Sequence, residues 1–324
     1  MSRLPRFLRK DRTTIYHVVS RTALDGLPFK AEEKDYMLEL IRKFSKLFFV
    51  DILGFCIMGN HLHLVCRVYP EDEVSDEEVK RRYKEYYGED QFISARDIEY
   101  YSKRWTSLSE LVKDIKQAFS KYYNRKHNRK GFFWGERFQS MIVEEGHTLV
   151  NLLAYVDLNP IRAGIVKRPE DYRCSSLGYH IQSGNKDDLL SLDFGIRDWD
   201  EHDSQEIVRK YREFVYETGA VDAGPVKCRE AALPEAGFNR AGKGAVIDQK
   251  VVNRERKRNY KVSRTERFLY RTRYFTDAGI IGSKEFVGEV FDQVKHMLRS
   301  KDQRRFKPVG GINGVYAMKR LKTR

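Results

Sequence analysis

Two histidines separated by a single residue are the first candidates for chemistry in this chain. His61 and His63 lie in the apolar run 61–68, directly after a Gly59–Asn60 pair. Residues two apart on a β-strand point to the same face, so the two imidazoles would stand side by side. Neutral imidazoles bind divalent metals, and the spacing therefore predicts part of a metal site. Two structural histidines on a half-buried strand would show the same pattern.

A tyrosine and an asparagine further along the chain could complete such a site. Tyr155 and Asn159 belong to the apolar segment 148–159, which we expect to be a helix capped by Thr148 and ended by Pro160. Residues four apart share a helical face. If this helix packs against the histidine strand, it places an amide oxygen and a phenol beside the imidazoles. The alternative is a core helix whose tyrosine and asparagine only lie near its end.

Three other side chains could line the same site. Cys56 and Cys66 lie on the apolar runs around the histidine pair, so a zinc site of cysteine and histidine is conceivable, although core packing explains them better. His17, in the preceding strand, could face the same site or be structural. The four cysteines of the chain are widely spaced, which argues against a disulfide framework.

The elements that must position these residues form a small α+β domain. Hydrophobic periodicity predicts strands at 14–21, 50–57, 61–68 and 140–144, and helices at 31–48, 109–125, 148–159 and 203–218. A capping box at Ser107 and Glu110 should start the helix at 109–125. A turn around 279–282 should precede a last helix. A sheet built from such strands and helices is typical of the α+β class.

The composition indicates a polyanionic partner. The chain has 324 residues, of which 61 are Lys or Arg and 47 are Asp or Glu, a formal net charge of +14. Basic and aromatic side chains alternate between 113 and 134, which suits nucleic acid, although an amphipathic helix with a basic end would look similar. Residues 250–273 are densely basic and fit phosphate contacts or a solvated helix. No membrane-length apolar run or signal peptide is evident, so we expect a cytoplasmic protein without a membrane partner.

Changes in composition suggest three regions. Residues 1–182 would be the catalytic domain, interrupted by an exposed, partly helical acidic insertion at about 70–104. Residues 183–244 would be a helical segment and linker. Residues 245–324 would be a basic extension of the kind that binds DNA.

Several ordered blocks resemble one family. Residues 59–65 (GNHLHLV) resemble the histidine–hydrophobe–histidine motif of single-strand DNA nucleases. Residues 153–164 (LAYVDLNPIRAG) look like the tyrosine block of IS200-like transposases, and more closely that of their REP-associated branch. Residues 16–21 (YHVVSR), together with Asn124, Gly131, Arg137, Asp171, Tyr172, Ser175 and Ser176, also fit this branch. The resemblance covers about residues 10–180.

This resemblance implies a fold and a reaction. The fold would be a ferredoxin-like catalytic domain, an antiparallel sheet with helices on one face, followed by a mainly helical C-terminal extension. His61 and His63 would bind Mg²⁺ or Mn²⁺, with Asn159 as third ligand where better-known relatives carry Gln. Tyr155 would attack single-stranded or hairpin DNA to form a 5′-phosphotyrosine, and His17 is a candidate base. The basic residues expected to contact DNA are Arg21, Lys116, Lys121, Arg125, Arg137, Arg162, Arg254 and Arg258.

Two other functions remain open at this point. The chain could be a non-catalytic or regulatory nucleic-acid-binding protein on the same scaffold. It could also be a metal-dependent hydrolase that activates water, with Tyr155 in a structural role. A monomer is favoured over a homodimer.

Overall fold

The computed structural model describes residues 7–166, 169–196, 204–215, 278–297, 306–308 and 314–319. The segments 228–244 and 250–273, with Arg254 and Arg258, lie outside the described residues. No helix in the described ranges is both long and apolar enough to cross a membrane.

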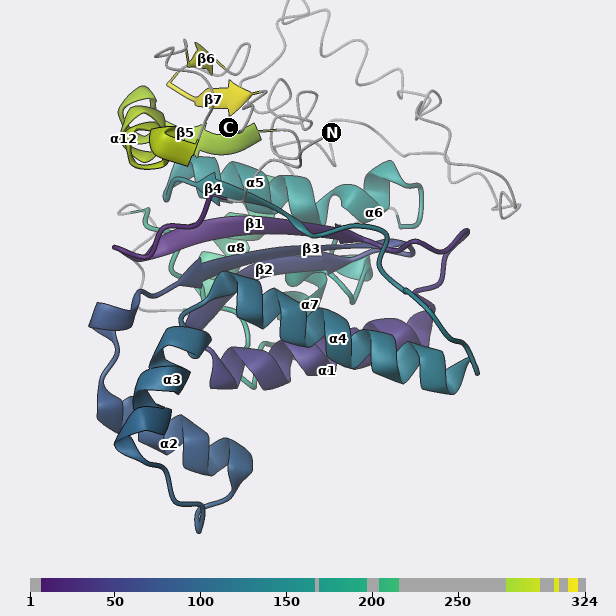
Figure 1. Cartoon of the computed structure of the whole chain (residues 1–324). Helices are drawn as coiled ribbons and strands as arrows, with labels where there is room; N and C mark the ends of the chain where they lie inside the picture. Colours follow the sequence, from purple (N-terminus) through teal and green to yellow (C-terminus); the bar gives the residue numbers. More distant parts are fainter. Residues whose placement is uncertain are drawn as a thin grey trace, which may run out of the picture.

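The centre of the protein is a four-stranded antiparallel sheet. Its strands are β1 (Thr14–Arg21), β2 (Val50–Ile57), β3 (His61–Val68) and β4 (Gln139–Val143), in the order β2-β3-β1-β4. Helix α1 (Ala31–Leu47) connects β1 to β2, and α4 (Leu108–Lys126) lies between β3 and β4. This order of strands and helices is the ferredoxin-like arrangement, so the predicted α+β fold is confirmed (Figure 1).

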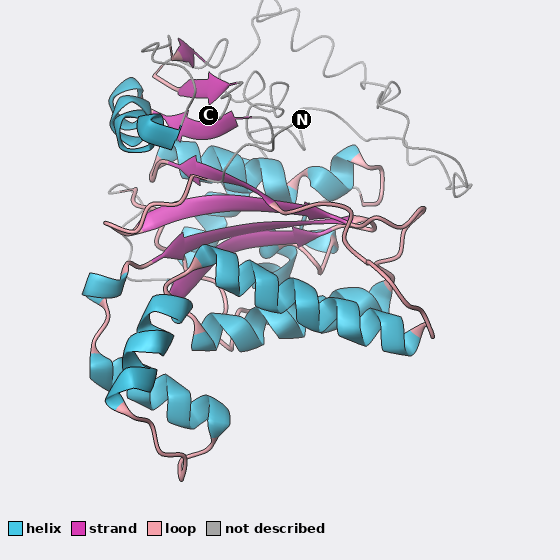
Figure 2. Ribbon diagram, viewed as in Figure 1, coloured by secondary structure: helices cyan, strands magenta, loops and turns pink. Residues whose placement is uncertain are grey.

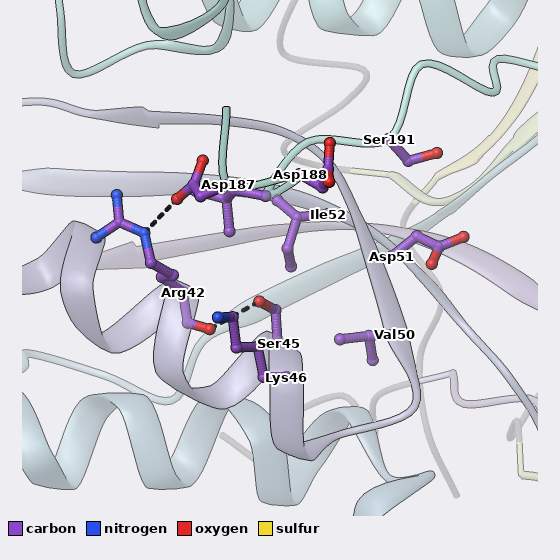
Figure 3. Close-up of a pocket in the computed structure, with 10 residues that line it drawn as sticks. Arg42, Ser45, Lys46, Val50, Asp51, Ile52, Asp187, Asp188 and Ser191 are labelled. Carbon is purple, nitrogen blue, oxygen red and sulfur yellow. Dashed lines mark hydrogen bonds and ion pairs between the residues drawn. The ribbon is translucent and has the colours of Figure 1, made fainter. Parts of the chain in front are cut away.

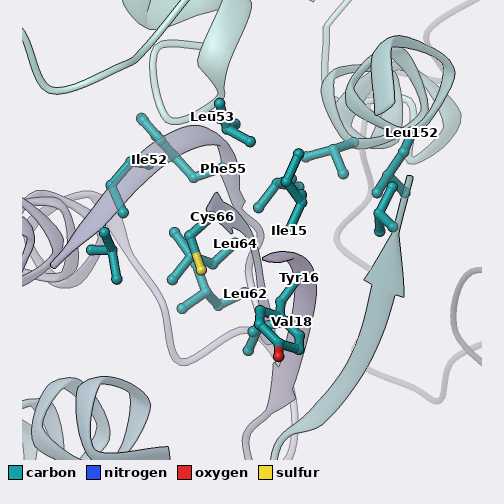
Figure 4. Packing of buried hydrophobic residues seen from close by; sticks show 14 of the residues in the cluster. Ile15, Tyr16, Val18, Ile52, Leu53, Phe55, Leu62, Leu64, Cys66 and Leu152 are labelled. Atoms are coloured by element: carbon teal, nitrogen blue, oxygen red, sulfur yellow. The ribbon is translucent and has the colours of Figure 1, made fainter. Parts of the chain in front are cut away.

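The alternation of apolar and polar residues determines what each face of the sheet carries. Tyr16 and Val18 of β1 lie opposite Cys66 and Leu64 of β3, and these side chains are buried together (Figure 4). Helices α1 and α4 cover one face of the sheet (Figure 1). These side chains belong to that face, because the alternating residue His63 contacts Tyr155 on the other side. The residues between them therefore point to the opposite face of the sheet.

Helices cover this opposite face as well, which the prediction of helices on one face did not include. Helices α5 (His147–Asp157) and α7 (Ser176–Ser183) pack on β2. The cap of α5 is Gly146, at φ 77°, and Thr148 lies buried inside the first turn. Pro160 does not end α5, because the helix already stops at Asp157. It lies instead in the first turn of the short helix α6 (Asn159–Arg162), where a missing N–H costs nothing.

The acidic insertion forms a helical hairpin, in agreement with the exposed and partly helical prediction. A short turn of 3₁₀ helix, η1 (Glu71–Glu73), leads into α2 (Asp76–Tyr87) and α3 (Ala95–Trp105), which project away from the sheet (Figure 2). The predicted capping box before α4 forms only in part. Ser107 accepts a hydrogen bond from the Glu110 amide, but the Glu110 carboxylate pairs with Arg104 and Lys113 instead of returning to the cap.

The described C-terminal residues extend the sheet. Strands β5 (Ala278–Gly282), β7 (Tyr316–Lys319) and β6 (Lys307–Pro308) follow β4 in that order, giving seven strands among the described residues. The pairing of β5 with β4 is parallel, so the complete sheet is mixed. The expected turn at 279–282 was wrong, because Ile280 and Ile281 make this segment a buried strand.

The remaining elements are helical. Helix α12 (Lys284–Val294) packs on β5 and continues into η5 (Lys295–Met297). Helix α8 (Ser204–Val215) agrees with the predicted helix 203–218 and contacts α5 and α7. A short 3₁₀ helix, η2 (Pro169–Asp171), packs beside α7. The predicted mainly helical extension therefore also supplies strands to the sheet.

The contact between α7 and the chain at Tyr172 gives a stability prediction. A Cβ on Gly178 would lie 1.9 Å from the Tyr172 carbonyl oxygen, and backbone cannot move aside as a side-chain end can. We expect Gly178→Ala to lower the free energy of unfolding by about 3 kcal/mol or more, measured by chemical denaturation. Gly288→Ala in α12 is the control, because its Cβ would meet only Phe306 at 3.5 Å. Equal stability of both variants would contradict the packing described here.

Candidate metal and tyrosine site

Three histidines lie together on the sheet face that α5 covers. In the β1–β3 register, His63 is opposite Val19 and His61 is opposite Arg21, which puts His17 on the same face. The His17 Nε2 and His63 Nδ1 atoms are 3.0 Å apart. The His61 and His63 ring centroids are 5.0 Å apart, with the planes at 80°. The predicted side-by-side placement of His61 and His63 is therefore observed.

Helix α5 places Tyr155 against this pair. The rings of Tyr155 and His63 meet edge to face, with centroids 6.0 Å apart and planes at 90°. The helix comes this close because β2 has glycine at position 54, where a Cβ would lie 2.4 Å from the Leu153 Cδ2 atom. Leu153 is two residues before Tyr155, so the contact that seats the helix also sets the place of the tyrosine.

Asn159 lies at the start of α6, one helical turn beyond Tyr155. Its Nδ2 atom donates to the carbonyl oxygens of Tyr155 at 3.2 Å and Val156 at 3.1 Å. These two bonds use the donor end of the amide, so Oδ1 is the end with acceptor capacity left for a ligand. The side chain is only partly buried. An amide oxygen in this orientation has the chemistry of the predicted third ligand.

Burial keeps both candidate imidazoles neutral. Desolvation, together with the nearby charge of Arg21, lowers the pKa of His61 to about 4. Desolvation also moves the pKa of His63 well below its usual value, helped by the neighbouring histidines. A neutral imidazole has a free lone pair on one nitrogen, which is the form that binds a metal.

The hydrogen bonds of the two rings decide which nitrogen keeps that lone pair. His61 Nδ1 lies 2.7 Å from the Asn60 side-chain oxygen, so this nitrogen carries the hydrogen and donates. The Nε2 atom of His61 then holds the lone pair. His63 Nδ1 faces His17 Nε2, and one of these two nitrogens must donate to the other. Partners of this kind orient ligating histidines in metal sites.

Two predicted DNA-contacting arginines border the site. The Arg162 guanidinium lies over the Tyr155 ring, 4.1 Å from its centroid, and also donates to the Tyr155 carbonyl oxygen. Arg21 ends β1 opposite His61. Both side chains are exposed. Positive charge therefore lies on the tyrosine side and on the histidine side of the site.

The other predicted DNA contacts lie on α4 and the loop after it. Lys121 and Arg125 are exposed on α4, and Arg137 is exposed before β4. Lys116 lies over the Trp134 ring, 5.1 Å from its centroid, and donates to the Glu136 carbonyl oxygen. These four residues lie along α4 and the chain that returns to the sheet, whose Gly135 amide donates to the Arg21 carbonyl oxygen at 3.1 Å.

The cysteines do not extend the histidine cluster into a zinc site. Cys66 points to the α1 and α4 side of the sheet, opposite the histidines, and burial raises the pKa of its thiol to about 12. Cys56 faces His63 across β2 and β3, but burial raises its thiol pKa strongly too. Among the described residues, no group of three or more His, Cys, Asp or Glu side chains is placed to hold a metal.

A cavity of about 160 Å³ opens at the β2 edge of the sheet. It lies between α1 and residues 187–191 and contains the Arg42–Asp187 ion pair at 2.5 Å (Figure 3). None of its lining residues belongs to the histidine and tyrosine cluster. The cavity is therefore separate from the candidate site.

The structure also shows a buried carboxyl that the sequence analysis missed. Asp157 is fully buried at the end of α5, where its oxygens accept hydrogen bonds from the Leu177 amide at 3.0 Å and the Tyr211 hydroxyl at 2.5 Å. Burial raises the pKa of Asp157 to about 7. These bonds join the helix that carries Tyr155 to α7 and α8. An aspartate inside an otherwise apolar helix was the sequence signal.

The Asp157–Tyr211 bond gives a second stability prediction. Tyr211→Phe leaves a buried carboxyl without one donor, so we expect a loss of about 1–3 kcal/mol in unfolding free energy. Tyr69→Phe is the matched control, because Tyr69 donates to Asp51 at 2.5 Å but both residues are half-buried. Its loss should stay below about 1 kcal/mol, since water can replace the missing donor. Equal losses in thermal or urea unfolding would show that burial does not decide the cost.

No family model matches the chain, and no curated protein sequence does. One solved structure that matches is a REP-associated tyrosine transposase bound to a REP hairpin. It is 14% identical, with a TM-score of 0.39, and the match covers 60% of this chain and 90% of that chain. The assignment of function therefore rests on the side chains described above.

Proposed function

We propose that this protein is a metal-dependent tyrosine transposase that cleaves and rejoins single-stranded or hairpin DNA of the REP type. The observation that supports this proposal is the placement of the Tyr155 ring against the buried His63, beside the half-buried His61, where desolvation keeps both imidazoles neutral. A metal-binding pair beside a phenol is what phosphotyrosine chemistry on DNA requires. In this proposal residues 1–182 form the catalytic domain, and the protein acts as a monomer.

The donor set fits a divalent metal. The hydrogen bonds leave His61 Nε2 and Asn159 Oδ1 available, and they leave His63 Nε2 available when His63 Nδ1 donates to His17. Imidazole with amide oxygen suits Mn²⁺, or Mg²⁺ with additional water. When bound, such an ion supplies Lewis-acid neutralisation of the scissile phosphate. Arg162 and Arg21 add positive charge on either side, where they can hold the phosphates of the strand.

Tyr155 is the proposed nucleophile. Its Oη atom forms a bond to phosphorus while the bond from phosphorus to the 3′ oxygen breaks, which leaves a 5′-phosphotyrosine and a free 3′-OH. The phenol proton leaves Tyr155 as the new bond forms, and the departing 3′ oxygen takes up a proton. Because the covalent link conserves the phosphodiester bond energy, a 3′-OH can reverse the reaction and join strands without a nucleotide cofactor.

His17 is better placed to orient His63 than to act as base. Its Nε2 atom already lies 3.0 Å from His63 Nδ1, and the side chain is 1% exposed. If His63 donates this hydrogen bond, its Nε2 keeps the lone pair for the metal, which is the arrangement that Asn60 gives His61. His17 is therefore proposed as a positioning residue for the metal site.

Tyr155→Phe tests the nucleophile. We expect the wild type, given Mn²⁺ and labelled single-stranded hairpin DNA from beside its own gene, to form a slow-migrating covalent species on a denaturing gel. The variant should form none, and chelator should abolish the species, while DNA affinity changes less than about threefold.

The other outcomes of that gel separate the remaining functions. Metal-dependent cleavage that persists in Tyr155→Phe would show that the nucleophile is an activated water and not the tyrosine. Binding without cleavage by the wild type, on DNA that it recognises, would support a regulatory nucleic-acid-binding protein. The control is Tyr122→Phe, which changes a half-buried tyrosine on α4 and should leave the covalent species unchanged.

His17→Leu tests the positioning role through the metal itself. We expect Mn²⁺ affinity, measured by electron paramagnetic resonance of free Mn²⁺, to fall about 10- to 100-fold. The ¹⁵N shifts of His63 in the apo protein should also lose the signature of a hydrogen on Nδ1. His127→Gln, at a half-exposed histidine bonded to Glu33, is the control and should leave both readouts unchanged. Unchanged Mn²⁺ binding in His17→Leu would refute the role.

A further inference from the structure

One large aromatic side chain beside the site is almost completely exposed. Phe132 lies in the loop between α4 and β4 and is 89% exposed, whereas the next residue, Phe133, is 1% exposed. Exposure of a whole phenylalanine ring forgoes the stabilisation that burial would provide. The contrast between adjacent residues shows that the loop lies against the core and buries Phe133 there, but leaves Phe132 in solvent.

The backbone on both sides of Phe132 is held in place. The Gly131 carbonyl oxygen accepts from Asn124 Nδ2 at 2.8 Å, on the α4 side. The Phe133 carbonyl oxygen accepts from the Ala23 amide and the Thr22 hydroxyl, both at 2.8 Å. The Phe133 ring packs among other aromatics, 4.6 Å from Tyr123 between centroids. Phe132 is therefore presented outward from a fixed backbone.

This loop borders the histidine end of the sheet. The Thr22 residue that holds Phe133 also donates from its amide to the Asn60 carbonyl oxygen at 3.0 Å. Asn60 in turn accepts from His61. On the other side of the loop, the Gly135 amide donates to the Arg21 carbonyl oxygen at 3.1 Å. A short chain of hydrogen bonds thus connects the segment that carries Phe132 to the candidate metal ligand.

The charge around Phe132 suits a polyanion. Residues 125–135 contain no Asp or Glu, and Arg125 and Lys130 are exposed there. The described part of the chain offers a close comparison in Phe92, which is 84% exposed. Glu89 and Asp90 precede Phe92 in the acidic insertion, so the two exposed phenylalanines differ mainly in the charge beside them.

We propose that Phe132 is a stacking platform for an unpaired base of the DNA strand that enters the site. An aromatic ring with basic neighbours binds the face of a base while the cations hold the adjacent phosphates. A base inside a duplex has both faces covered by its neighbours, so the platform selects single-stranded DNA. This inference rests on the proposed function for its choice of substrate, but it concerns binding and not cleavage.

The test is the affinity of the full chain for two probes at fixed salt. Fluorescence anisotropy would be measured with a labelled dT15 oligonucleotide and with a fully paired 15-base-pair duplex, without metal. We expect Phe132→Ala to weaken dT15 binding about 5- to 100-fold and to change duplex binding less than twofold. Phe132→Trp should keep the wild-type affinity, and Phe132→Leu should behave like the alanine variant because it is apolar but cannot stack.

Phe92→Ala is the matched control and should bind both probes as the wild type does. The inference is overturned if Phe132→Ala binds dT15 with wild-type affinity, if it loses duplex affinity equally, or if the wild type does not bind dT15. The outcome is independent of the covalent-adduct gel. If Phe132→Ala weakens dT15 binding but the wild type forms no covalent adduct, the stacking platform is supported and the nuclease proposal is refuted. If the wild type forms the adduct but Phe132→Ala binds dT15 normally, the nuclease proposal is supported and the platform is refuted.

Discussion

The antiparallel register of β1 and β3 is the constraint on which the candidate site depends. It puts Arg21 opposite His61 and Val19 opposite His63, with His17 on the same face two residues earlier. A shift by one residue would turn the histidines of one strand to the other face, because strand side chains alternate. The buried side chains Leu62, Leu64 and Val18 hold the register, since the same shift would turn those of one strand away from the core that they share. Core packing on one side of the sheet thereby fixes the chemistry on the other.

A second helical layer brings the tyrosine to this face. Gly54 permits the close approach of α5 to β2, and Asp157 joins the end of α5 to α7 and α8. The Gly54 contact fixes α5 just before Tyr155 by steric fit, and the buried hydrogen bonds of Asp157 fix it just after Tyr155. The nucleophile is therefore held by residues that have no chemical role of their own. Rigid support of this kind is what a site for in-line attack requires.

Much of this arrangement could be predicted from local sequence patterns. The helices α1, α4 and α8 follow from hydrophobic periodicity, and the strands β1, β2 and β3 follow from short apolar runs, which are buried on both faces. The shared face of His61 and His63 follows from their spacing on a strand. The contact of Tyr155 with His63 could be expected only in outline, since it depends on how α5 packs against β3.

The failures of prediction have particular physical causes. Asp157 was overlooked because its partners Leu177 and Tyr211 are distant in sequence, and only folding brings them together. The turn expected at 279–282 is a strand because two glycines flank buried isoleucines, and a glycine-rich strand is locally indistinguishable from a loop. Thr148 was expected to cap α5, but the positive φ of Gly146 starts the helix two residues earlier.

The pairing of β4 with β5 has a consequence for biosynthesis. β4 ends at Val143, and its parallel partner begins at Ala278, so the ribosome must make residues 144–277 before this pairing can form. Until then β4 is an edge strand with unpaired backbone groups, the kind of edge through which nascent chains associate wrongly. The protein is therefore vulnerable to aggregation through this edge between these two points of its synthesis, and Tyr155 is itself made while the sheet is still open.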